Sequence, residues 1–170
     1  MLGTIISDSL SWNSNCANIV RKCNMRLQLL REVASFGTDI TTMKLIYMQI
    51  VRVILEGSCQ VWHSSLTKKN RKSLERCQKM ALRIILPNLE YKAALAKLNL
   101  DTLENRRNHL TLRFAKQARE HNKLSHLFQE NIKTHQMKTR NMKTYSEIAH
   151  TERYKKSAIM NMKHILNSLK

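Results

Sequence analysis

Four basic side chains recur at helical spacing in the middle of the chain: Lys72, Arg76, Lys79 and Arg83. Steps of three and four residues place side chains on one stripe of an α-helix, and Lys68 extends that stripe by one step. Lysine and arginine neutralise phosphates and release counterions, so such a row suits binding to a nucleic acid backbone with little sequence reading. A row of charges can equally be the solvated side of a helix, and periodicity alone leaves both interpretations open.

The helix that must carry this row is predicted over residues 67–87. Thr67 can cap its start, and Pro87 must end it. Apolar side chains fall on the side opposite the cations, which indicates a core face and a cationic face back to back. These apolar residues are Leu74, Cys77, Ala81, Ile84 and Ile85.

The composition favours an acidic partner and a helical fold. The 170 residues include 30 Lys and Arg against 12 Asp and Glu, a formal net charge of +18. That excess favours nucleic acid and, less often, an anionic membrane or an acidic protein. Three glycines and one proline are too few for the turns of a sheet protein, so a mainly α fold is predicted. No run of 18 apolar residues occurs, and we therefore predict no membrane span.

Hydrophobic periodicity divides the chain into four regions. Residues 1–12 read as a residual strand or linker. Residues 13–86 predict a three-helix bundle, 88–132 a helical extension, and 133–170 a basic tail with a possible terminal helix. The second helix of the bundle, 40–62, is apolar nearly all round, which predicts a central helix covered by its neighbours. Gly57-Ser58 is expected to kink it or to end it early.

Three further residues have individual predictions. Arg106 is expected to support the phosphate contacts of the row. Arg107 falls between Leu103 and Leu110 in an apolar stripe, where an unpaired guanidinium is costly. We therefore read Arg107 as a structural tether to a carboxylate or a helix C-terminus, with an anion contact as the alternative. Trp62 is predicted to be a structural, core residue.

No reaction centre is visible in the sequence. The glycines are isolated, acidic residues occur singly, and the histidine spacings do not match zinc sites. The four cysteines lie far apart and are predicted to be buried free thiols in a reducing, intracellular compartment. We predict no catalytic residue, no metal and no cofactor, hence no enzyme. A site assembled from scattered His and Cys remains the enzymatic alternative.

Short sequence landmarks follow one another along nearly the whole chain. They are Leu2-Gly3, Leu10-Ser11-Trp12, Arg26-Leu27 with Leu30, Leu45-Ile46-Tyr47, Val61-Trp62, Leu74-Glu75 to Gln78, Ala81 to Ile85, Leu103 to Arg107, Arg153 to Ser157 and Leu166-Asn167. In this order they resemble the C-terminal part of reverse transcriptases from jockey-like non-LTR retrotransposons. The chain departs from that pattern at Glu56-Gly57, where Tyr-Gly is usual, and at Asp8, which is displaced.

That resemblance implies a thumb, a helical bundle that grips a template–primer duplex, followed by a helical extension. The palm and its metal-binding aspartate pair are absent from this sequence, so the resemblance implies a non-catalytic fragment of an RNA-directed DNA polymerase. Its expected partners are RNA, DNA or their hybrid and a palm-bearing polypeptide, in the cytoplasm, the nucleus or both. The alternatives are a helical protein–protein interaction module, docking through the surface that once met the palm, and a functionless remnant.

Overall fold

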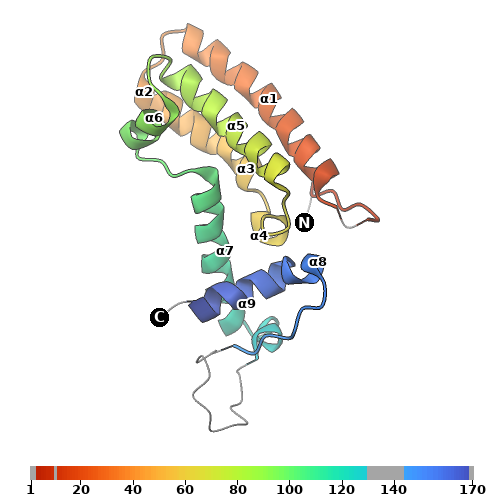
Figure 1. Cartoon of the computed structure of the whole chain (residues 1–170). Helices are drawn as coiled ribbons and strands as arrows, with labels where there is room; N and C mark the ends of the chain where they lie inside the picture. Colours follow the sequence, from red (N-terminus) through yellow and green to blue (C-terminus); the bar gives the residue numbers. More distant parts are fainter. Residues whose placement is uncertain (1–2, 10, 130–143, 169–170) are drawn as a thin grey trace. The chain divides into compact units, whose positions relative to one another are not determined.

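The computed structural model describes residues 3–9, 11–129 and 144–168 (Figure 1). The protein is mainly α, which confirms the predicted fold class. In chain order the elements are α1 (Asn13–Ser35), α2 (Ile40–Ile46), the π-helical η1 (Tyr47–Arg52), α3 (Val53–Glu56), α4 (Cys59–Trp62), α5 (Lys68–Ile85), α6 (Tyr91–Leu98), α7 (Leu103–Glu120), the 3₁₀-helical η2 (Ser125–Phe128), α8 (Glu152–Lys155) and α9 (Ala158–Ser168).

The chain forms two compact units. The first comprises Met1–Cys59 and Leu66–Arg107, and the second comprises Gln60–Ser65 and Asn108–Lys170. This division differs from the predicted one at Pro87, because residues 88–107 belong to the first unit. Residues 130–143, which include the end of the predicted extension and the first part of the predicted basic tail, lie outside the described residues.

The segment before α1 forms no strand in residues 3–9 and 11–12. Instead, the Ile5 amide donates to Asn15 Oδ1 at 3.1 Å, which ties an irregular stretch to the first turns of α1. Of the two predictions for residues 1–12, a strand or a linker, the strand is not found in residues 3–9 and 11–12. A strand needs a neighbour for its backbone hydrogen bonds, and a side-chain amide satisfies one of these groups instead.

The first helix, α1, forms as its apolar seam predicts. Its buried residues include Cys16, Ile19, Cys23, Leu27 and Leu30, at steps of three and four. Asn13 and Ser14 are residue types that favour an N-cap, but Trp12 holds this position, without a side-chain hydrogen bond. The helix ends at Ser35, and two residues later Gly37 has a φ of 73°, a left-handed conformation that glycine adopts without strain.

Residues 40–56 of the predicted second helix, 40–62, form one continuous helical run of α2, η1 and α3, and α4 follows separately. The break between α3 and α4 falls at Gly57-Ser58, where Ser58 has a positive φ of 52°. Met43, Tyr47, Val51 and Leu55 are buried at a constant step of four. Four residues overshoot an α-helical turn by about 40°, and the wider π turn of η1 offsets that drift. The π segment therefore keeps one face pointed at the core.

The face of α2, η1 and α3 that points away from the core is open to solvent. The prediction of a helix buried on all sides is therefore wrong. Leu45 is 51% exposed, Met48 37% and Val53 60%. The sequence is apolar on both faces, but α1 and α5 cover only one of them within the first unit.

Helix α5 lies alongside α1 in the first unit, as Figure 1 shows. The Thr67 hydroxyl accepts from the Asn70 amide at 3.2 Å, so Thr67 is the N-cap that the sequence predicts. The Asn70 side chain also donates to Asn13 Oδ1 at 2.8 Å, which places the N-terminal ends of the two helices together. Along the apolar face Leu82 is buried, whereas the predicted Ile84 is only half-buried.

The second unit has a smaller core. Ala115, Ala118, Phe128, Met162 and Leu166 form it. Phe114 on α7 is 38% exposed, and the neighbouring Ala115 takes the inward position. Helix α9 lies where the sequence suggests a terminal helix.

Candidate nucleic-acid interface

The cationic row lies on α5 and is open to solvent. Lys68, Lys72, Arg76, Lys79 and Arg83 are all exposed. Among the described residues, none of the five forms an ion pair with a carboxylate. At 3.6 residues per turn the five side chains span about 80° of the helix surface and about 22 Å of its length. The structure therefore brings all five predicted row residues together on one accessible stripe.

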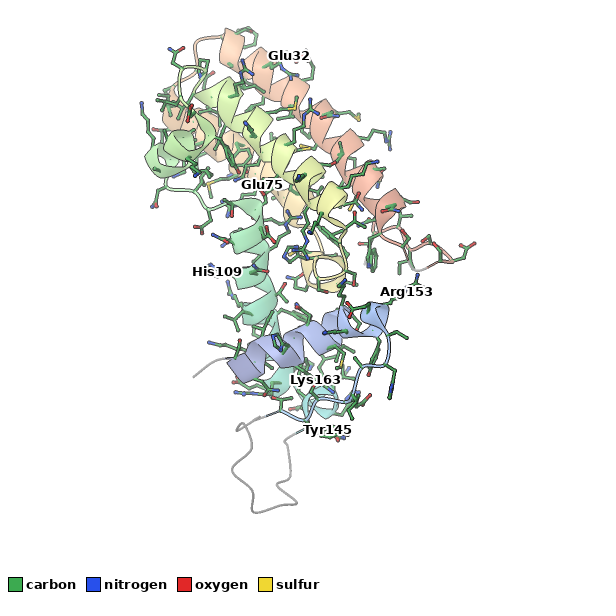
Figure 2. The ribbon with its side chains drawn as sticks, in the orientation of Figure 1. Glu32, Glu75, His109, Tyr145, Arg153 and Lys163 are labelled. Atoms are coloured by element: carbon green, nitrogen blue, oxygen red, sulfur yellow. The ribbon has the colours of Figure 1, made fainter. Side chains whose placement is uncertain are left out.

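The only acidic residue of α5, Glu75, borders this stripe, but its carboxylate bonds to the neighbouring helices. Its Oε1 accepts from the Tyr91 hydroxyl of α6 and from the Leu103 amide of α7, at 3.3 Å for the amide. Glu75 itself is labelled in Figure 2. Because this carboxylate is engaged with α6 and α7, it sits beside the row without closing an ion pair with any of its members.

Gln78 extends the same buried network. It accepts from the Tyr47 hydroxyl at 2.7 Å and donates to the Tyr91 hydroxyl at 3.1 Å and to the Asp101 carbonyl at 2.9 Å. Burial raises the pKa of Tyr47 and of Tyr91, and the hydrogen bond to Glu75 raises the pKa of Tyr91 further. These contacts fix η1, α6 and the start of α7 against α5 and so hold the row in place.

Sequence reasoning missed this network. The available signals were weak: a glutamine beside Cys77 in an apolar seam, and Tyr47 in a long apolar run. Taken alone, each of these two residues is typical of the boundary between the core and the surface. Their pairing depends on a contact across 31 positions, which no local pattern reveals.

Arg106 does not lie on the row, and its side chain forms an ion pair with Glu56 of α3. Its Nε lies 3.3 Å from Glu56 Oε1, and the same oxygen lies 2.6 Å from Arg52 Nε. The side chain of Arg106 is 39% exposed, against 15% for Glu56. A half-buried, paired guanidinium is a weaker phosphate ligand than the five residues of the row, because it must first give up its partner.

Arg107 is buried, with 1% of its surface exposed. Its Nε donates to the Leu103 carbonyl at 3.0 Å. Burial lowers its pKa, and the nearby Glu75 carboxylate opposes that shift. The acceptor is a backbone carbonyl in the first turn of its own helix, so the predicted tether to a carboxylate or a helix C-terminus and the anion contact both stay predictions. Trp62 is fully buried, in keeping with a core role.

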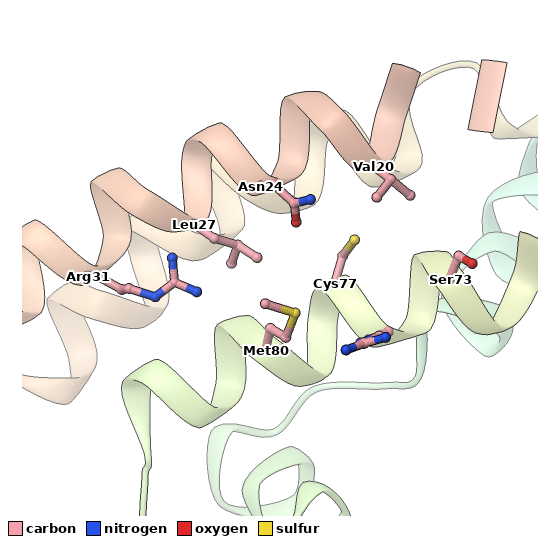
Figure 3. Close-up of a pocket in the computed structure, with 8 residues that line it drawn as sticks. Val20, Asn24, Leu27, Arg31, Ser73, Cys77 and Met80 are labelled. Carbon is pink, nitrogen blue, oxygen red and sulfur yellow. The ribbon is translucent and has the colours of Figure 1, made fainter. Parts of the chain in front are cut away.

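A groove of about 440 Å³ runs between α1 and α5 on one side of the row. In Figure 3, Val20, Asn24 and Leu27 from α1 face Cys77 and Met80 from α5 across it. Arg31 and Arg76 also line this groove. Arg31 of α1 therefore lines the same groove as Arg76 of the row.

All four cysteines are free and buried, as predicted. A hydrogen bond to Cys77, together with burial, raises the pKa of Cys23. Burial raises the pKa of Cys16 and of Cys59 to about 11. The thiols of Cys16, Cys23 and Cys59 are protonated at neutral pH and behave as small core residues, whereas the hydrogen bond from Cys23 lowers the pKa of Cys77.

The histidines are dispersed. His63 is buried and its Nε2 lies 3.0 Å from Asn108 Oδ1, a polar contact within the second unit. His109, His121 and His126 are exposed, and His135 lies outside the described residues. In the part of the chain that the structure describes, no three His, Cys, Asp or Glu side chains gather as a metal would require. Over the same residues, no helix has the length and apolar character needed to cross a membrane.

Comparison with known proteins adds no assignment. No protein-family model, no curated protein and no solved structure matches this chain. The resemblance to reverse transcriptases of jockey-like retrotransposons accordingly stays a prediction from the sequence landmarks. The geometry of α5 is the basis for the functional proposal.

Proposed function

We propose that this chain binds nucleic acid through its phosphate backbone, with the row on α5 as the main contact. The observation that carries the proposal is the set of five exposed basic side chains, without carboxylate partners among the described residues, on one stripe of a fixed helix. A phosphate backbone presents charges at regular intervals, so a straight row can engage several at once.

The composition of the row favours the backbone over the bases. Between Lys68 and Ile85 helix α5 has no aromatic residue, and aromatics make up 5% of the chain. Binding of single strands by stacking depends on such side chains. A double helix exposes phosphates on its outside, and we therefore propose an RNA–DNA hybrid or another duplex as the preferred ligand, with structured RNA as the variant form.

The sequence landmarks support the same proposal from another direction. In the enzymes that they resemble, the thumb grips a template–primer duplex. We propose that this chain is a non-catalytic, thumb-like part of such a polymerase, which acts on nucleic acid by holding it.

The test is a binding measurement at two salt concentrations. Five phosphate contacts give a slope of log affinity against log salt of about −4. Changing Lys72, Arg76, Lys79 and Arg83 to Glu should remove most of the affinity for a hybrid duplex and flatten that slope. The matched control changes four exposed cations of the second unit, Arg113, Lys116, Arg119 and Lys123, to Glu. Equal losses in both variants would refute the assignment to α5.

A second candidate function has one observation in its favour. Leu45, Met48 and Val53 expose apolar surface along α2, η1 and α3. Exposed apolar patches often mark protein interfaces, and a palm-bearing polypeptide is the partner that the resemblance suggests. Light scattering that shows self-association, together with negligible binding of a hybrid duplex at physiological salt, would favour this interaction module over the nucleic acid grip.

A further inference from the structure

The cationic row ends at a cavity formed by the C-terminal half of α5, the 86–90 turn and the start of α6. Its volume is about 700 Å³, within the range of small-ligand sites. Two members of the row, Lys79 and Arg83, belong to its lining, so the cavity is continuous with the proposed backbone contact.

Positive charge dominates the lining. Lys92 of α6 joins Lys79 and Arg83, and Glu90 is the one carboxylate among the lining residues. Three cations against one anion leave a net positive charge, which favours an anionic group. None of the three cations forms an ion pair with a carboxylate in the described residues.

The remaining lining is largely apolar. It is contributed by Leu82, Pro87, Leu89 and Ala94, with Tyr91 and Asn88 adding an aromatic residue and an amide. The hydroxyl of Tyr91 is bonded to Glu75 and Gln78, so this residue is held in position. A ligand that fits has a phosphate at one end and a flat, mainly apolar body with hydrogen-bonding edges at the other. A nucleotide has this chemistry.

We propose that the cavity receives one unpaired nucleotide of the bound nucleic acid. Its phosphate lies against Lys79, Arg83 and Lys92, and its base lies against the apolar wall. The base must leave its stack to enter, so a strand end or a bulge is the form that fits. This inference rests on the proposed function, because the row delivers the strand to the cavity.

Lys92 separates the two proposals experimentally. It lines the cavity but stands on α6, outside the row. Lys97 is exposed on the same helix and does not line the cavity, and it therefore serves as the matched control. The variants are Lys92→Glu and Lys97→Glu, with Lys92→Arg to restore the charge.

The experiment compares two hairpin duplexes of the same stem, one blunt and one with a three-nucleotide single-stranded overhang. Wild-type protein should bind the overhang form roughly tenfold more tightly, as expected for one charge-assisted phosphate contact with a buried base. Lys92→Glu should lose that preference and keep most of its affinity for the blunt duplex. Lys97→Glu and Lys92→Arg should retain the preference.

Three results would overturn the inference. They are equal binding of both hairpins by wild type, the same preference in Lys92→Glu, and loss of the preference in Lys97→Glu. Failure of the proposed function looks different, because then neither hairpin binds with a salt slope that depends on Lys72 and Arg76.

Titration with adenosine monophosphate and with inorganic phosphate, followed by amide shifts of α6, separates a free nucleotide from a strand end. Shifts at Tyr91 and Lys92 with the overhang hairpin, and none with the blunt one, are the expected pattern.

Discussion

The two units of the protein are both rich in cations but arrange them differently. On α5 of the first unit, five exposed cations follow one stripe over about four turns. On α7 of the second unit, Arg113, Lys116 and Arg119 are also exposed, yet at 100° per residue they wind around the helix by about 120° within two turns. Lys155 and Lys156 lie 3.8 Å and 3.3 Å from the Glu152 carboxylate. The cations of α5 differ from those of α7 in their alignment and from those of α8 in the absence of an ion pair with a carboxylate.

The two units also differ in the size of the side chains that they bury and in the polar bonds within their cores. The first unit buries large side chains and joins three segments through the hydroxyls and amide around Gln78. The core of the second unit contains two alanines among five residues. A satisfied buried network specifies one arrangement of its helices. The first unit is therefore the better platform for a row whose spacing must stay fixed.

The largest expected effect comes from a cavity in the core of the first unit. Leu55 is fully buried on α3, and Leu55→Ala should destabilise this unit by roughly 3 kcal/mol, through lost burial and the space left behind. Hydrogen exchange should show faster exchange in α1 and α5, with α9 unchanged. If α9 lost its protection to the same extent, the two units would unfold as one and the comparison would fail.

The next effect concerns the polar network. Gln78→Leu removes the partner of the Tyr47 hydroxyl and of the Asp101 carbonyl, and leaving such groups unpaired should cost roughly 2 kcal/mol. Adding Tyr47→Phe should recover part of that loss in denaturant unfolding. Gln28→Leu, on the exposed side of α1, is the control and should change stability little. A double variant no more stable than Gln78→Leu would show that the pair is not coupled.

Alkaline pH should weaken the first unit. The folded-state pKa values of Tyr47 and Tyr91 are raised above 10, and those of Cys16 and Cys59 are raised from 9.0 to about 11, chiefly by burial. Above pH 9 to 10 the unfolded chain therefore releases protons that the folded chain keeps, and stability falls as pH rises.

The expected loss is about 1 kcal/mol per pH unit for each such group, measured as the denaturation midpoint between pH 8 and pH 11. Tyr47→Phe should reduce this slope. Stability that stayed constant through pH 11 would contradict the buried, protonated state of these groups.

The local pattern was sufficient to predict α1 and α5. Their apolar residues recur at helical steps, and Thr67 and Gly37 mark their boundaries. The local pattern was insufficient for residues 40–62. Both faces of this helix carry apolar residues, so the pattern does not tell which face a neighbouring helix covers. The π turn at Tyr47–Arg52 also lacks a sequence mark of its own.

For the candidate site, the row could be predicted because all five cations lie on one helix, where spacing fixes direction. The bonding of Glu75 to the neighbouring helices, the pairing of Arg106 with Glu56, and Lys92 in the cavity depend on contacts between distant segments. Such contacts are set by tertiary packing, which a helical period does not encode.

The most direct test of the account is the salt dependence of hybrid-duplex binding for two single variants. Arg76→Gln removes one charge from the row on α5, and Arg113→Gln removes one from the exposed surface of α7. We expect the slope of log affinity against log salt to become shallower by about 1 for Arg76→Gln and to stay the same for Arg113→Gln. The same slope for both variants would contradict a phosphate grip centred on α5.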